Sequence, residues 1–361
     1  EHEHEHEHDR DPNSSDDGDA LTWAEFARRP RSKLQKMFSQ RFDQQNFKTL
    51  LDTSSSSNKA RLRSCGGPHA AGWQLATPAA PLQRLDDEDY RTTARALLGQ
   101  APAPAGAPCC DRARTGARAG TACGEPLCRD ARHAFRCPTG GGTKARSSDL
   151  ELAWARVHAE CGYRTERQVH VPGWDRWPWR CPGCGSRGTS DAQPPALCAT
   201  CGTALESRRE EAILDLEVQG LTQPRLFYDV TVRYSVPGDA GSLAAAAERD
   251  GAVNRTAEAD KRRRYPEGRT PWRAVPLALE TCGRHGPTAL RVLRELAREQ
   301  GRQGGAGEED AYLATGALVQ RWGAELSVAL HRATARQLRS ALGADFAAAT
   351  AAGALAEAAA A

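Results

Sequence analysis

The sequence has no long apolar run, and none approaches the roughly 18 uninterrupted apolar residues that a membrane-spanning helix needs. The N-terminus is not a signal peptide and opens with alternating Glu and His. We therefore expect an intracellular protein that does not enter a membrane. Without an export signal, the 12 Cys, several of them in close pairs, favour metal sites over disulfides.

The net charge of +3 conceals an uneven distribution. Residues 1–20 carry nine acidic residues and one Arg, a balance of −8, so residues 21–361 carry +11. A basic body is expected of a protein that meets a polyanion, although GC-rich coding also produces an Arg surplus. Residues 1–20 are of low complexity and predict a disordered acidic tail.

Composition divides the remaining chain into five segments. Residues 21–64 predict a helical arm and linker, 65–108 an accessory segment, 109–144 a zinc knuckle, 145–345 a core and 346–361 an Ala-rich tail. In the core, helical and strand-like stretches follow one another, with a weak point at Gly251 in one helix and an edge strand indicated by Pro276. This order predicts an α/β layered fold.

Two cysteine clusters have zinc-ligand spacing. Cys181-Pro-Gly-Cys184 and Cys198-Ala-Thr-Cys201 are each followed by Gly, a pattern typical of paired knuckles that form a closed, structural four-thiolate site. Four free thiols or two disulfides are the alternative. Nearby Trp residues could stack on bases or pack over the zinc; they are Trp174, Trp177 and Trp179.

The second cluster has the ligand types of a CCHC zinc site with looser spacing. Its members are Cys123, Cys128, His133 and Cys137. Cys109 and Cys110 are spare candidates that could replace one member. We expect up to two structural zinc ions in the chain.

The stretch Glu211–Tyr234 reads as two strands of period two. Leu214, Leu216 and Val218 share one face of the first strand. A hairpin centred near Thr222 would place Asp215 opposite Asp229 on the other face, where like charges about 5 Å apart destabilise each other. Two carboxylates kept there predict a Mg2+ or Mn2+ site. Glu217 and Glu160 are further candidate ligands.

Cationic residues lie on two predicted helices after this hairpin. Lys261 and Arg262, Arg263 and Arg264 end the first helix, and Arg291, Arg294 and Arg298 form the outward stripe of the next. If the carboxylate pair and its metal ion serve a nuclease, the enzyme also needs such a cation near the phosphate that it attacks. A basic helix end that complements the helix dipole is the alternative reading.

Three motifs together resemble a known family. The stretches 229–234 (DVTVRY), 260–266 (DKRRRYP) and 275–286 (VPLALETCGRHG) resemble the restriction-like endonuclease domain, of the PD-(D/E)xK superfamily, at the C-terminus of non-LTR retrotransposon reverse-transcriptase proteins. The Cys123–Cys137 cluster is similar to the zinc knuckle before that domain, and residues 72–78 to the linker ahead of the knuckle. The resemblance covers roughly residues 65–342 and lacks the polymerase.

The resemblance implies a restriction-endonuclease-like core, a mixed sheet flanked by helices, and a nuclear enzyme that nicks target DNA. The family's two metal-binding acids fall on Asp215 and Asp229. Thr231 stands where the superfamily usually has its lysine, and Leu214 where it has Pro, so the lysine would be Lys261 on the following helix. The arginines named above would grip the DNA backbone.

Two other classes of function stay open. The chain could be a catalytically inactive zinc-binding fragment of a mobile element that only binds DNA or RNA. It could also be a protein-interaction module in which both zinc elements are structural.

Overall fold

The computed structural model describes residues 31–77, 83–100, 106–113, 119–128, 132–220, 225–303 and 308–343. The chain forms two compact units, Glu1–Ser54 and Ser55–Ala361. In the first, the described part is helix α2 (Arg31–Thr53). The predicted acidic tail and Ala-rich tail lie outside the described residues.

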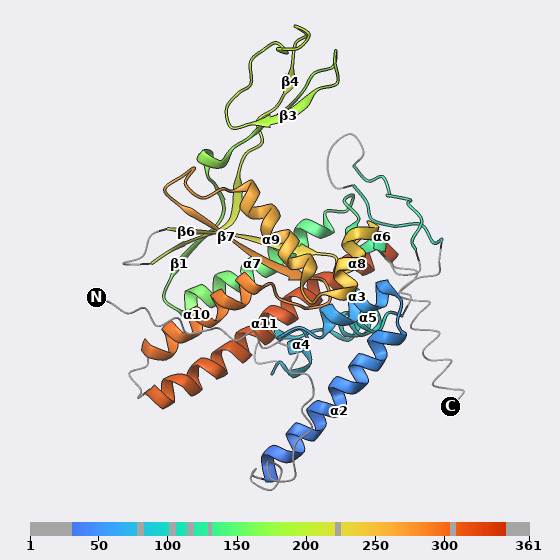
Figure 1. The fold of residues 1–361 in the computed structure, drawn as a ribbon, viewed down its shortest axis with the longest axis vertical. Coiled ribbons are helices and arrows are strands. Elements are labelled where there is room, and N and C mark those ends of the chain that lie inside the picture. Colours follow the sequence, from blue (N-terminus) through green and yellow to red (C-terminus); the bar gives the residue numbers. More distant parts are fainter. Residues whose placement is uncertain are drawn as a thin grey trace. The chain divides into compact units, whose positions relative to one another are not determined.

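The second unit is built on a four-stranded mixed sheet (Figure 1). Strands β1 (Arg164–His170), β5 (Ile213–Gln219), β6 (Leu226–Arg233) and β7 (Arg273–Glu280) lie in that order. The pairs β1–β5 and β5–β6 are antiparallel and β6–β7 is parallel. The predicted α/β fold with a mixed sheet flanked by helices is confirmed. Strand β7 is an edge strand, as Pro276 indicated.

The predicted hairpin has the expected register. Leu216 pairs with Tyr228 and Val218 with Leu226, so each pair is centred on position 222. The turn residues 221–224 lie outside the described part of the chain. Because side chains alternate along a strand, this register puts Asp215 opposite Asp229.

Three long helices cover one face of the sheet. They are α7 (Gly142–Glu160), α10 (Pro287–Gln303) and α11 (Glu308–Leu342). Trp154, Leu293 and Trp322 from these helices are fully buried in one core with Leu216 and Leu277 of the sheet. Figure 1 shows α10 and α11 running side by side, and they are in contact.

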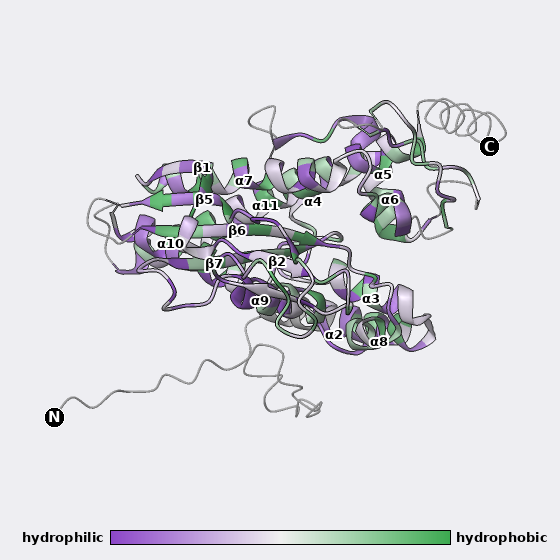
Figure 2. Cartoon of the chain, turned by 90° about the horizontal axis from the view of Figure 1, so that it is seen from above, coloured by the Kyte–Doolittle hydropathy of each residue, from purple (hydrophilic) through white to green (hydrophobic). Residues whose placement is uncertain are grey.

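The crossover from β6 to β7 consists of helices α8 (Ala240–Glu248) and α9 (Ala252–Arg264). They are separated at the predicted weak point, where Gly251 has φ of 66°, a left-handed conformation that favours Gly. Figure 2 shows α9 largely in the colour of hydrophilic residues. Of the helices in the described ranges, none is both long and apolar enough to cross a membrane.

Four short helices precede the sheet. They are α3 (Ser56–Cys65), α4 (Gly72–Leu75), α5 (Asp87–Leu98) and α6 (Arg132–Arg136). Ser55, from the Ser-rich stretch 54–57, caps α3 by accepting a hydrogen bond from the Asn58 amide. Helices α4, α5 and α6 all contact α11, so this region packs on the core.

A small second sheet lies between β1 and β5 in the sequence. Its strands β2 (Trp177–Arg180), β3 (Arg187–Ser190) and β4 (Glu206–Ser207) have the order β3-β2-β4. In Figure 1, β3 and β4 extend away from the four-stranded sheet. We call residues 176–210 the arm.

Candidate functional site

The structure brings Asp215, Asp229 and Lys261 together. The Lys261 Nζ lies 2.7 Å from one carboxylate oxygen of Asp229 and 2.9 Å from the other. The Asp229 side chain is only 5% exposed, so this is a largely buried ion pair. Lys261 reaches it from α9, the second helix after β6.

The backbone is irregular where β5 meets each of its two neighbouring strands at Asp215. The ladder between β5 and β6 ends at Leu216 and Tyr228, and the Val230 amide donates instead to Asp215 Oδ2 at 2.6 Å. On the other side, Gln168 of β1 has φ of 55°. A left-handed non-Gly residue costs about 1–3 kcal/mol, and such strain is found mostly at functional sites.

The same irregularity divides the predicted apolar row on β5. Leu216 and Val218 pack in the core under α7, whereas Leu214 packs in a separate cluster with Trp174 and Phe227. Leu214 therefore packs against different partners from Leu216 and Val218. The strand changes its packing partners at Asp215.

Two residues of the cluster were missed at the level of sequence, Glu151 and Gln168. Glu151 is a buried acid on α7, and the Gln168 Nε2 donates to Glu151 Oε2 at 3.0 Å and to Asp215 Oδ1 at 3.2 Å. Arg167 also donates to Glu151 at 3.0 Å. The signal available in the sequence was that Glu151 lies close to Leu150 and Ala153 on a helix that packs in the core. An acidic residue is seldom buried there unless it is paired.

The electrostatics of the cluster show an excess of negative charge. Burial, followed by the charges of Asp229 and Glu151, raises the pKa of Asp215 to about 8. Burial and the neighbouring Asp229 also raise the pKa of Tyr265, which follows α9. Three carboxylates therefore share Lys261 and the more peripheral Arg167, an arrangement that a further cation would relieve.

The other two predicted carboxylate ligands do not reach this cluster. Glu160, at the end of α7, accepts hydrogen bonds from Arg321 at 2.5 Å and from Trp322 Nε1 at 2.9 Å, both on α11. Glu217 is buried and pairs with Arg225 at 2.7 Å. Each is neutralised by its own arginine, so Glu151 takes the place we expected for Glu160.

The donor types of the cluster suit a hard divalent cation. Carboxylate oxygens are the ligands that Mg2+ prefers, and Mg2+ uses one or two of them while keeping several waters. Asp215 and Asp229 on facing strands fit that requirement. The acids do not form a closed cage, because the groups of three or more metal-binding side chains within 4.8 Å among the described residues are both cysteine-rich.

The first of these groups is the predicted four-thiolate site in the arm. Ligand atoms of Cys181, Cys184, Cys198 and Cys201 all lie within 4.8 Å of one another. Cys181 Sγ is 3.4 Å from Cys201 Sγ, and Cys184 Sγ is 3.7 Å from Cys198 Sγ. This cluster could hold a structural zinc ion, as its spacing predicted.

The two knuckles of the arm have the same backbone hydrogen bonds. The Cys181 amide donates to the Ser186 carbonyl and the Gly185 amide to the Cys181 carbonyl. The second knuckle repeats this pattern with Thr203 and Gly202. Gly185 and Gly202 have φ of 73° and 70°, which explains why each Cys pair is followed by Gly.

The arm is held to the core at Trp174 and Asp175. Trp174 is fully buried and packs edge-on against Phe227, so it cannot stack on a base. Asp175 accepts hydrogen bonds from Arg209 Nη2 at 2.5 Å and from the Ala212 amide at 2.7 Å. These contacts hold the two ends of the arm together next to the start of β5 and against β6.

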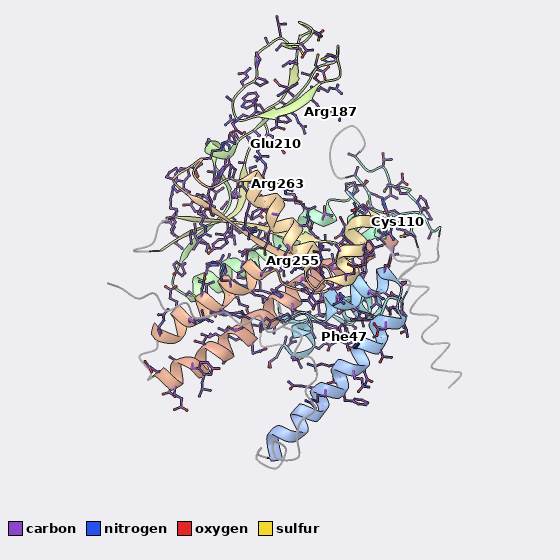
Figure 3. All side chains as sticks on the ribbon, in the orientation of Figure 1. Phe47, Cys110, Arg187, Glu210, Arg255 and Arg263 are labelled. Carbon is purple, nitrogen blue, oxygen red and sulfur yellow. The ribbon has the colours of Figure 1, made fainter. Side chains whose placement is uncertain are left out.

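Helix α9 also contacts the base of the arm. Arg176 exchanges backbone hydrogen bonds with Glu210, and its side chain donates to the Arg263 and Arg264 carbonyls. Figure 3 labels Glu210 and Arg263 at this junction and Arg187 farther out on the arm. The helix that carries Lys261 is therefore tied to the arm.

The second metal-binding group corrects one predicted ligand. It consists of Cys109, Cys123, His133 and Cys137, with Cys109 in the place expected for Cys128. Cys109 Sγ is 3.8 Å from Cys137 Sγ, and Cys123 Sγ is 3.3 Å from His133 Nε2. This group could hold a second structural zinc ion.

Backbone pairing explains why Cys109 replaces Cys128. The Cys109 amide donates to the Glu125 carbonyl and the Gly124 amide to the Cys109 carbonyl, which brings Cys109 beside Cys123. Cys128 is exposed, and its sulfur accepts a hydrogen bond from the Arg132 amide. Cys110, labelled in Figure 3, is exposed and outside the group.

The arginines expected to bind DNA fall into two sets. Arg262 pairs with Glu258 and Thr288, and Arg264 donates to the Trp174 carbonyl, so both have structural contacts. Arg263 is 75% exposed and pairs with Asp260. On α10, the stripe of Arg291, Arg294 and Arg298 is exposed.

Comparisons of the chain with protein-family models, curated proteins and solved structures found no match. Fold and site together define an α/β protein with a mixed sheet, a buried carboxylate–lysine cluster and two Cys/His groups that could hold zinc.

Proposed function

We propose that the protein is a divalent-metal-dependent endonuclease that nicks DNA, with a restriction-like core. The observation that carries this proposal is the convergence of Asp215, Asp229 and Lys261 from β5, β6 and α9 on one buried cluster with Glu151. A lysine on the helix after the second acid is what the resemblance to the retrotransposon nuclease implies.

Each residue has a role that follows from its position. Asp215 and Asp229 would hold Mg2+ or Mn2+, and the Val230 amide keeps the Asp215 carboxylate oriented. A bound Mg2+ neutralises charge on the attacked phosphate and lowers the pKa of a bound water. Lys261, beside Asp229, places an ammonium group where negative charge develops on the phosphate. Glu151 and Gln168 position Asp215.

DNA is the proposed partner, and action on chromosomal DNA would take place in the nucleus. The exposed stripe of α10 and Arg263 would contact phosphates. The tie between α9 and the arm would let the arm contact the same duplex. Affinity should then fall steeply with salt, since each neutralised phosphate releases counterions.

One observation favours a second candidate, a catalytically inactive nucleic-acid-binding protein. Lys261 contacts both oxygens of Asp229, the atoms that would also bind the ion. If Lys261 cannot yield one of them, the chain binds DNA without cutting it.

Nicking of supercoiled plasmid with Mg2+ tests the proposal. We expect nicking by the parent protein, none with EDTA, and a loss of about 100-fold or more in Asp215→Asn and Lys261→Met, the magnitude usual for removing one electrostatic contact to a transition state. Lys59→Met, on α3 and outside the cluster, is the charge-matched control and should nick normally.

Binding measured beside nicking separates the alternatives. Plasmid binding without nicking by the parent would favour the inactive binder. No binding at low salt would favour a protein-interaction module with structural zinc.

A further inference from the structure

A cavity of about 740 Å3 lies beyond the carboxylate cluster, between the first turns of α7, the end of β6, and α8 with α9. Its lining is mixed polar and apolar, and it contains more cations than acids. Arg136, Lys144, Arg146 and Arg233 line it, against Asp239 and Asp260. The function proposed above does not use it.

Arg146 is the most informative residue of this cavity. Its side chain is buried, with 3% of the residue exposed. The two terminal nitrogens make long hydrogen bonds to backbone carbonyls, 3.4 Å to Phe135 and 3.3 Å to Val232, and Nε has no partner among the described residues. No carboxylate in the described ranges pairs with it. Burial lowers the pKa of Arg146 to about 10, so it stays charged at neutral pH.

A buried charge without a counter-charge is costly, which indicates that an anion belongs beside Arg146. The two acids of the cavity are paired with groups other than Arg146. Asp239 caps α8 through the Ser242 amide, and Asp260 pairs with Arg233 and Arg263. Lys144 is exposed at the cavity and has no ion pair within the described chain.

The start of α7 adds hydrogen-bond donors to the same cavity. The residue before the helix is Gly141, which has no side chain to cap it. The first amides of a helix bind anions when no side chain satisfies them. Thr143 also lines the cavity and offers a hydroxyl group.

Two elements contribute residues both to the cavity and to the carboxylate cluster. On α7, Ser147 and Glu151 are four residues apart and therefore on one side of the helix. On β6, Thr231 lies two residues after Asp229 on the same face, a separation of about 7 Å. The elements that build the cluster thus also line the cavity.

We propose that this cavity binds a phosphate group of the nucleic-acid strand that occupies the carboxylate cluster, with Arg146, Lys144 and the start of α7 as its ligands. Binding of phosphate stands on the cavity alone. Its assignment to a nucleic-acid strand rests on the proposed function.

The test compares the parent protein with Lys144→Ala, Arg146→Met and, as a control for one lost charge, Lys59→Ala. Two probes are used: inorganic phosphate in thermal unfolding, and a fluorescent DNA oligonucleotide in anisotropy titrations over a salt series. We expect phosphate to stabilise the parent and Lys59→Ala, but not Arg146→Met. Lys144→Ala should bind the oligonucleotide more weakly and reduce the salt slope by about one.

Each result supports or overturns the inference. Stabilisation by phosphate that needs Arg146, with unchanged oligonucleotide binding in both variants, would overturn the assignment to nucleic acid and leave a site for a free phosphate. No effect of phosphate on the parent and no change in either variant would overturn the site. If Arg146→Met does not fold, the exposed Lys144→Ala decides.

The test is independent of catalysis. If the parent binds the oligonucleotide through Lys144 but never nicks a plasmid, the nuclease proposal fails and the phosphate site stands.

Discussion

Replacing Asp215 with Asn should stabilise the metal-free protein while it lowers the proposed nicking activity about 100-fold or more. Burial and the charges of Asp229 and Glu151 raise the pKa of Asp215 from 3.8 to about 8. At pH 7 Asp215 is therefore protonated in the folded protein and ionised in the unfolded chain. This difference lowers the free energy of unfolding by up to about 4 kcal/mol, since each pKa unit is worth about 1.4 kcal/mol. Asn is the neutral isostere and can still accept the Val230 amide. We expect a gain of about 2–4 kcal/mol.

The dependence on pH follows from the same shift. The pKa of Asp215 is higher in the folded protein than in the unfolded chain. The stability that protonated Asp215 contributes is therefore complete at low pH and is lost as pH rises from about 4 to about 8. Over that window the parent should lose up to about 1.4 kcal/mol per pH unit from this group, and Asp215→Asn should not. Mg2+ should stabilise only the parent, by about 2.7 kcal/mol at a hundredfold excess over its Kd.

Urea unfolding across this pH range, with and without Mg2+, measures both effects. Glu166→Gln, an exposed acid-to-amide change on β1, is the matched control and should follow the parent. The reasoning is refuted if Asp215→Asn is less stable than the parent throughout, or if Mg2+ stabilises the two proteins equally.

Three further predictions concern the metal groups, the arm and the core. Cys109→Ala should lower bound zinc by one ion per chain in metal analysis, whereas Cys128→Ala should not, and the reverse result would restore the ligand set expected from spacing. Asp175→Asn removes the negative charge that both Arg209 and the Ala212 amide contact. Limited proteolysis should then cut the arm faster while the core persists. A digest unchanged from that of the parent would contradict this anchoring. Burial lowers the pKa of His158 to about 4. The stability of about 3 kcal/mol that neutral His158 contributes to the folded protein should therefore disappear as pH falls from about 6.5 to 4. The free energy of unfolding of His158→Phe should depend less on pH over this range than that of the parent.

Features that depend on neighbours in the sequence were predictable. The two arm knuckles are local turns, so the spacing of Cys181 and Cys184 and the following Gly185 already specified their geometry. The β5–β6 register followed from period-two alternation about a short turn, and the division between α8 and α9 from Gly251. In each case the physical cause lies within about ten residues.

Features that depend on distant packing were not predictable in this way. Glu151 enters the cluster because α7 packs against β1 and β5, and Gln168 enters it because β1 pairs with β5. Neither residue has a motif around it. Cys109 displaces Cys128 because a backbone pairing brings it beside Cys123.

Thus the sequence by itself determined the two facing aspartates, the four-thiolate element and the order of helices and strands, since these arise from local periodicity and turn chemistry. Only the tertiary structure decided that Lys261 of α9 reaches Asp229, 32 residues earlier, and that Arg146 is buried in a cavity without a counter-charge. Such contacts depend on how whole elements pack, and the alternation of side chains along one element does not encode them.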